Sequence, residues 1–135
     1  MNIRFAFAVN EDNSFADIHF GDAYRFLFYE IMGEHIYFVE TGSNIHSTVY
    51  PETHGNEEKG QSMVRYLREK NVNVIVSRKF GKNVDLIRKS FLPVLVKGSE
   101  PHEITKCLSK HIAEIKKILK NKPKTYNIID SREWS

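Results

Sequence analysis

The spacing of apolar residues changes midway along this chain of 135 residues, and that change limits the folds it can adopt. The first part carries three successive runs of strand-forming residues, at 3–9, 24–31 and 35–41. Gly33 lies between the second and third runs, where it suits a tight hairpin turn. The first part therefore predicts a meander of three strands.

The second part of the chain alternates between helical and strand patterns. Met63, Val64 and Leu67 recur at helical spacing and indicate a helix over 59–70. A later stripe of Ile and Leu indicates a long helix over 101–120. Between these two helices we expect, in order, a buried strand over 72–77, a short helix over 84–91 and a strand over 92–96.

A meander followed by right-handed β-α-β crossovers predicts an α/β fold with one mixed sheet and helices packed on it. We expect five strands in the order 3-2-1-4-5, with strand 2 antiparallel. Strands 1, 3, 4 and 5 then end at the same edge. Strand 1 lies next to strand 4, where the connections reverse direction, and open α/β sheets bind ligands at such a point. The segments expected at this edge are 10–23, 42–60, 78–83 and 97–100.

Composition indicates a soluble globular protein, with 41% hydrophobic and 27% charged residues. No apolar run reaches the ~18 residues typical of a membrane span. The opening apolar stretch is too short for a signal peptide, and a single cysteine, Cys107, cannot form an internal disulfide. We therefore expect a cytoplasmic protein without a membrane partner.

Charge is divided unevenly along the chain, with a net −7 over residues 1–60 and +10 over 61–135. Such a division is typical either of a protein with an anionic partner or of helices whose solvent faces are covered by lysine. The lysines that can share a solvent face of the last helix are Lys106, Lys110, Lys117 and Lys120. No stacking aromatic residues accompany them, so nucleic acid is the less favoured partner.

Three histidines fall on loops at the expected functional edge: His19, His46 and His54. Imidazole is a common metal ligand, so these three residues are the candidate metal ligands. Gly21 lies beside His19 and permits a ligand to approach closely. The structural alternative is that His19 orders its loop by hydrogen bonding. Cys107 lies on the apolar stripe of the last helix and is expected in the core.

A basic loop follows the predicted strand over 72–77 and opens a helix. It contains Arg78, Lys79, Gly81 and Lys82. Backbone N–H groups at a helix start attract anions, and Gly81 removes a side chain there, so these four residues form a candidate anion-binding loop. The spacing is not that of a P-loop, and the alternative is a loop that is merely basic.

Residues 17–23, "DIHFGDA", follow "AFAVN" and together resemble the opening of the dinitrogenase iron-molybdenum cofactor biosynthesis family, the nitrogenase accessory-factor proteins. The stretches 44–46, "NIH", and 81–83, "GKN", extend the resemblance over roughly residues 1–120. It implies a ribonuclease-H-like three-layer α/β fold. It also implies a single domain over residues 1–121, with 122–135 as a C-terminal extension.

The resemblance implies a non-enzymatic carrier of an iron-sulfur or iron-molybdenum type cluster, with cluster donor and acceptor proteins as partners. His19 would be a ligand, Phe20 would anchor the loop, and Gly21 would admit a bulky anion. The basic loop would offset the negative charge of the cluster. The chain departs from the family in two places: the glycine- and histidine-rich loop is thin at 51–60, and the loop at 77–81 is basic.

Two alternatives stay open beside the carrier. One is an anion- or partner-binding regulatory module that has kept the scaffold without a cluster. The other is a nuclease, because ribonuclease-H-like folds often host two-metal chemistry. That chemistry needs clustered carboxylates holding ions ~4 Å apart. The strand at 3–9 contains none, and Asp17 and Asp22 lie on the following loop, so a nuclease is less favoured.

Overall fold

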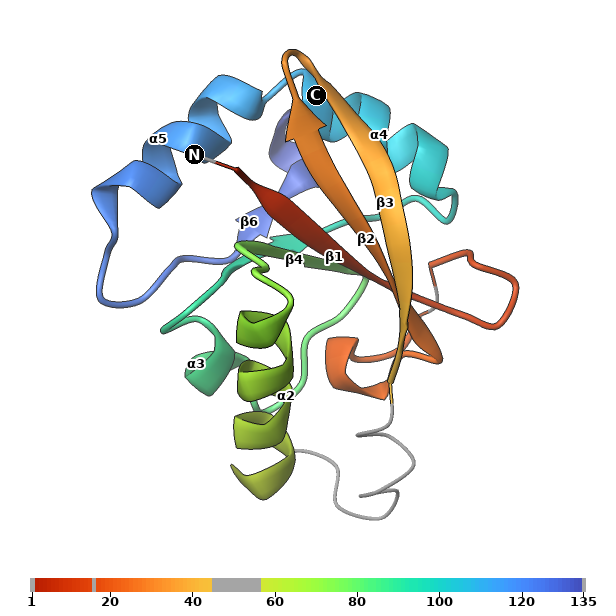
Figure 1. Ribbon diagram of the computed structural model, residues 1–135, viewed down its shortest axis with the longest axis vertical. Helices are drawn as coiled ribbons and strands as arrows, with labels where there is room; N and C mark the ends of the chain where they lie inside the picture. The colour runs from red at the N-terminus through yellow and green to blue at the C-terminus, as the bar shows by residue number, and fades with distance from the viewer. Residues whose placement is uncertain (1, 16, 45–56, 135) are drawn as a thin grey trace.

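The computed structural model describes residues 2–15, 17–44 and 57–134, and it places a six-stranded sheet between two layers of helices (Figure 1). The strands are β1 Arg4–Val9, β2 Arg25–Met32, β3 His35–Ser43, β4 Val74–Ser77, β5 Leu92–Leu95 and β6 Ile129–Asp130. The helices are α2 Glu57–Glu69, α3 Val84–Ile87, α4 Pro101–Ser109 and α5 Ile112–Asn121, with short 3-10 turns η1 Phe20–Asp22 and η2 Ser131–Trp134.

The strands lie in the order β3-β2-β1-β4-β5-β6. Strand β2 runs antiparallel to both β1 and β3, while β1–β4, β4–β5 and β5–β6 are parallel pairs. The predicted order of the first five strands and the antiparallel β2 are confirmed. The prediction of five strands was wrong, because the tail adds β6 beside β5. Two residues are too few to produce a strand pattern in the sequence.

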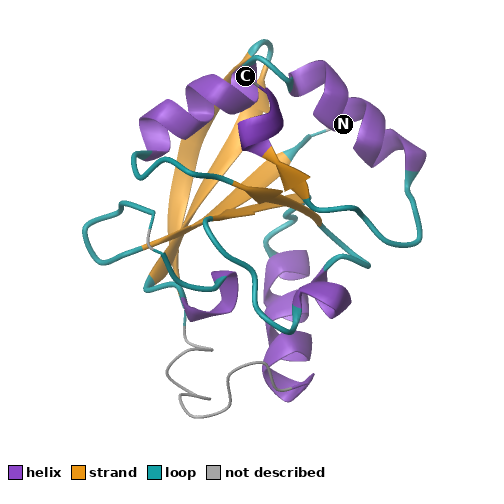
Figure 2. Ribbon diagram, turned by 180° about the vertical axis from the view of Figure 1, so that it is seen from behind, coloured by secondary structure: helices purple, strands orange, loops and turns teal. Residues whose placement is uncertain are grey.

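The two faces of the sheet carry separate apolar cores, because successive strand residues point to opposite faces. Phe5 and Phe7 of β1 pack on the face covered by α4 and α5, whereas Ala6 and Ala8 face α2 and α3. Figure 2 shows the two helical layers on either side of the sheet from behind. The small alanine side chains of β1 leave room for the phenylalanines of β2 and η1 on the second face.

The long helix predicted over 101–120 is two helices, α4 and α5. The chain leaves helical geometry at His111, where φ is −123° and ψ is 21°. Neither glycine nor proline marks this break, so no breaker residue indicated it. The apolar stripe continues across the break, since its members Ile104, Leu108, Ile112, Ile115 and Leu119 are all buried in one cluster.

The tail after α5 is packed on the sheet at its β5 edge. The N–H of Tyr126 donates to the carbonyl of Arg88 at 2.8 Å, and Nε of Arg88 donates back to the carbonyl of Tyr126 at 2.6 Å. The Tyr126 side chain is buried, and Trp134 of η2 stacks on His111 with ring centroids 4.2 Å apart. None of the helices in the described residues has both the length and the apolar character that crossing a membrane requires.

Candidate functional site

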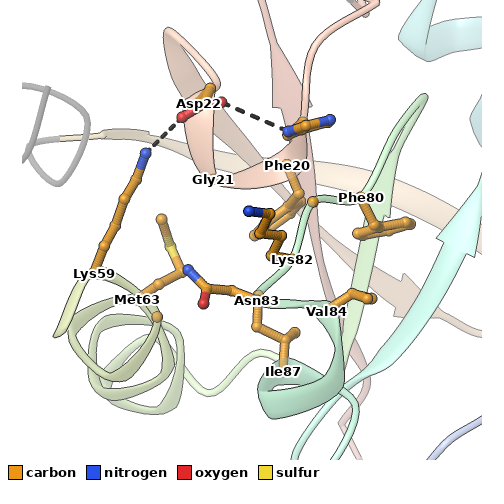
Figure 3. A pocket seen from close by; sticks show the side chains of 13 residues that line it. Phe20, Gly21, Asp22, Lys59, Met63, Phe80, Lys82, Asn83, Val84 and Ile87 are labelled. Carbon is orange, nitrogen blue, oxygen red and sulfur yellow. Dashed lines mark hydrogen bonds and ion pairs between the residues drawn. The ribbon is translucent and has the colours of Figure 1, made fainter. Parts of the chain in front are cut away.

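A shallow hollow of about 40 Å³, partly open to solvent, lies at the edge where β1, β3 and β4 end. Three segments far apart in the sequence form it: the turn η1, the start of α2, and the loop from β4 into α3 (Figure 3). Its lining residues are His19, Phe20, Gly21, Asp22, Lys59, Gly60, Met63, Phe80, Gly81, Lys82, Asn83, Val84 and Ile87. Of the four segments expected at this edge, 10–23, 78–83 and the described end of 42–60 therefore meet at the hollow, whereas 97–100 does not line it.

The turn that carries His19 is anchored by its neighbour. Phe20 is 1% exposed and packs on Phe26 and Phe80, with ring centroids 5.0 and 6.0 Å away. Its backbone N–H donates to the carbonyl of Lys79 at 3.0 Å, and His19 pairs with Lys79 in an isolated parallel bridge. The two loops at the sheet edge thus hold each other in place.

His19 lies at the mouth of the hollow with its side chain 52% exposed. Gly81 lies directly against the imidazole: a Cβ at that position would be 2.9 Å from Nδ1 of His19. Such a distance is shorter than real Cβ contacts, so Gly81 is needed for the close approach of His19. The sequence predicted a role for this glycine toward an anion, and the structure shows one toward the histidine.

Gly21 differs from Gly81, because the packing around it does not demand a glycine. A Cβ at Gly21 would lie 3.7 Å from Cε of Lys59, which is an ordinary van der Waals contact. Its φ is not positive, since Gly33 is the glycine with that conformation among the described residues. The missing side chain of Gly21 instead leaves space within the hollow that it lines.

A buried ion pair lies beneath the turn, and the sequence reasoning missed its lysine. Nζ of Lys59 lies 2.5 Å from Oδ1 of Asp22, and the Lys59 side chain is only 5% exposed (Figure 3). Oδ2 of the same aspartate lies 4.0 Å from Nδ1 of His19. One sequence signal could have drawn attention to Lys59, although not to its partner: it lies in the first turn of α2, where the helix dipole disfavours a cation unless a partner offsets it.

Asn44 ties the end of β3 to the same turn. Its Nδ2 donates to the carbonyls of Gly21 at 3.0 Å and Ala23 at 2.8 Å, and the residue is 5% exposed. Its buried Oδ1 has no donor among the described residues. Unsatisfied buried acceptors are costly. The orientation of the Asn44 amide is therefore set by the two hydrogen bonds that Nδ2 donates, and these bonds hold the backbone of the η1 turn.

Of the predicted anion-binding loop, only Gly81 and Lys82 line the hollow. Lys79 lies 3.4 Å from the carboxylate of Asp17, and Arg78 is not among the lining residues. Three of the four backbone amides of α3 are engaged within the turn: Val84 donates to the carbonyl of Gly81, and both Leu86 and Ile87 donate to that of Asn83. Attraction of an anion to the hollow would therefore depend on lysine charge more than on helix-start amides.

Of the three candidate metal ligands, His19 is the one that the structure places. His46 and His54 lie outside the described residues. Within residues 2–15, 17–44 and 57–134, no group of three or more His, Cys, Asp or Glu side chains could hold a metal ion. Cys107 lies on α4, on the opposite face of the sheet. Asp17 and Asp22 each pair with a lysine instead of forming a carboxylate cluster.

Comparison with known proteins matches this chain to one family. The family of dinitrogenase iron-molybdenum cofactor proteins matches residues 1–113. A crystal structure from Methanocaldococcus jannaschii, provisionally described as that of a dinitrogenase, is 18% identical with a TM-score of 0.56, covering 82% of this chain and 90% of that chain. At this identity the likeness concerns the fold alone. The curated proteins include no match. Because the match over residues 1–113 spans most of the sequence, the chain belongs to the dinitrogenase iron-molybdenum cofactor family.

Proposed function

We propose that this protein is a non-enzymatic carrier of an iron-sulfur or iron-molybdenum type cluster, bound reversibly at the hollow. The observation that carries the proposal is His19: an imidazole held half-exposed at the mouth of a hollow by a tightly packed turn. Family membership supports a role connected with the iron-molybdenum cofactor. The cluster is cargo in this proposal, and the protein would pass it between donor and acceptor proteins.

The residues of the hollow fit a loosely held cargo. His19 supplies one imidazole, and a cluster held by one or two imidazoles would be released more readily than a cluster held by four cysteine thiolates. Met63, Phe80 and Ile87 give the hollow an apolar wall suited to sulfide-rich surfaces. Lys82 is exposed at the rim, where its charge offsets the negative charge of a cluster. His46 and His54 stay predicted as further ligands.

The layered arrangement is also consistent with a ribonuclease-H-like fold, which we infer from the family and the strand order. A second function uses the same hollow: an anion- or partner-binding regulatory module without a cluster. Lys82 at the rim favours it. A two-metal nuclease is less favoured, since Asp17 and Asp22 are each paired with a lysine.

The test is anaerobic reconstitution of the full chain with iron and sulfide, with and without molybdate, for three proteins: wild type, His19→Ala and His35→Ala. His35 is a matched control, because it is also an exposed histidine but lies at the β2–β3 hairpin. Bound metal per chain and the visible absorption spectrum are measured. We expect stoichiometric binding by wild type and His35→Ala, and loss of binding in His19→Ala.

Two outcomes would contradict the proposal, the first its carrier role and the second its binding site. If folded wild-type protein binds no cluster, the regulatory module without a cluster becomes the better description. If wild type and His19→Ala bind equally, a cluster is carried but not at this hollow. Far-ultraviolet circular dichroism of all three proteins checks that the comparison is between folded chains.

A further inference from the structure

Asp22 lies between Lys59 and His19, two residues that also line the hollow. Oδ1 of Asp22 lies 2.5 Å from Nζ of Lys59, and Oδ2 of the same carboxylate lies 4.0 Å from Nδ1 of His19. The first distance is that of a short, charge-assisted hydrogen bond. The second is longer than a hydrogen bond but within the range of electrostatic attraction. One carboxylate thus faces a buried ammonium on one side and the imidazole on the other.

The burial of Lys59 is the second part of the argument. The Lys59 side chain is 5% exposed, so its ammonium loses most of its hydration, and the effective cost in proteins is several kcal/mol per ion. Apolar residues of similar volume are often neutral or stabilising at such positions. The fold alone therefore does not call for a lysine here. A role toward Asp22, and through it toward His19, accounts for the charge.

The orientation of the imidazole is the third part. Nδ1 of His19 faces inward, between the carboxylate of Asp22 and the backbone of Gly81, where a Cβ would come within 2.9 Å of it. The opposite ring nitrogen, Nε2, is therefore the one left to face a ligand. Histidines that bind metals commonly direct their second ring nitrogen to a carboxylate, which selects the tautomer and the ring orientation.

We propose that Asp22 is a positioning residue for His19. It holds the neutral imidazole with its proton on Nδ1 and the lone pair of Nε2 directed outward, and Lys59 holds Asp22 in place for this task. The proposal rests on the proposed function for the identity of the ligand. The orientation of His19 needs no ligand, so it can be tested in the protein alone.

The variants separate positioning from simple stability. Asp22→Ala removes the carboxylate that lies 2.5 Å from the buried Lys59 ammonium and is expected to lower the urea midpoint of unfolding. The double variant Asp22→Ala/Lys59→Met removes both charges and is expected to regain most of that loss. Glu40→Ala/Lys70→Met is the matched control, since it removes an ion pair of 3.0 Å that lies away from η1.

The decisive readout is the tautomer of His19, measured by two-bond 15N–1H correlation NMR on the cluster-free protein at alkaline pH, where imidazole is neutral. We expect the Nδ1–H form in wild type and in the control pair. We expect a shift toward Nε2–H, the form favoured by free histidine, in the double variant although its stability has recovered. A wild-type His19 that carries its proton on Nε2 would overturn the proposal. So would a double variant that keeps the Nδ1–H form.

Reconstitution with iron and sulfide then connects the orientation to binding. Loss of such supporting groups typically weakens metal binding by about 10- to 100-fold, and we expect this range for the double variant. Equal binding by the double variant and wild type would show that Asp22 does not position His19 for a ligand. If wild type binds no cluster while the tautomer results hold, the proposed function fails and the positioning by Asp22 stands.

Discussion

Gly81 is the residue whose replacement most directly tests the placement of His19. In Gly81→Ala the new Cβ would lie 2.9 Å from Nδ1 and 3.2 Å from Cγ of His19, so the imidazole must move. Because His19 is half-exposed, it can move into solvent at little cost to folding. We expect the urea midpoint to stay near that of wild type. We expect cluster binding in the reconstitution assay to fall at least about 10-fold, which is the smaller loss of metal affinity seen when a ligand is no longer held in its orientation.

Gly21→Ala provides the control for this prediction. Its Cβ would make only an ordinary contact, 3.7 Å from Cε of Lys59, so the position of His19 should not change. The His19 ring signals in the NMR spectrum are expected to shift in Gly81→Ala and to stay near their wild-type positions in Gly21→Ala. Unchanged cluster binding in Gly81→Ala would show that the observed position of His19 is not the one used for binding.

Some site residues could be predicted from short sequence motifs, whereas others could not. The motif around His19 and the glycine at 81 were visible as short patterns, and the structure brings both to one hollow. Lys59 and Asn44 were not recognised as parts of the site. Each acts through a partner more than 20 positions away, Lys59 on Asp22 and Asn44 on Gly21 and Ala23. No local pattern reports such a partner.

Among the elements, the contact between β3 and α2 depends on the absence of a side chain at Gly42. A Cβ there would come within 2.3 Å of the Tyr66 hydroxyl and 2.5 Å of Cε2 of Phe28. Gly42→Ala is therefore expected to lower the free energy of unfolding by about 1–3 kcal/mol, the usual cost of overpacking. Urea denaturation followed by circular dichroism measures the loss.

Tyr66→Phe on the Gly42→Ala background removes the hydroxyl contact and leaves the Phe28 contact. It should restore part of the lost stability, whereas Tyr66→Phe alone should not stabilise the wild-type protein. Full stability in Gly42→Ala would mean that β3 and α2 are spaced more widely in solution than in the structure.

The helices and strands differ in how far their sequence patterns determined them. Long periodic segments, such as β1 to β3 and α2, were predicted within a few residues of their observed bounds. The break between α4 and α5 was not, because the apolar stripe has the same spacing on both sides of His111. The two-residue β6 was also missed, since its pairing with β5 and not its composition makes it a strand.

For the whole molecule, the tail decides whether β5 is an edge strand. We propose that residues 1–121 form the domain and that 122–134 complete its sheet as an extension. A chain ending at Asn121 is expected to fold but to lose at least about 2 kcal/mol of stability, because it lacks the buried Tyr126. It should also self-associate, because its β5 edge is uncovered. Urea denaturation and sedimentation at two protein concentrations measure these effects.

Ile128→Ser in the full chain is the control for the truncation. Its side chain is 41% exposed, so this substitution should change stability by no more than about 0.5 kcal/mol. A truncated chain that is monomeric and as stable as wild type would show that the tail neither stabilises the fold nor protects the β5 edge from association.

Sequence patterns were enough to predict the class of fold, the order of the first five strands and the loop that carries His19. They could do so because strand and helix periods, and the direction of short connections, are local properties of the chain. The tertiary structure alone decided the sixth strand, the buried pair of Lys59 and Asp22, and the amide of Asn44 beneath the turn. Each of these depends on the pairing of segments that meet only when the chain is folded. Burial makes such a pairing matter for stability, because a polar group removed from water costs free energy unless it finds a partner within the protein.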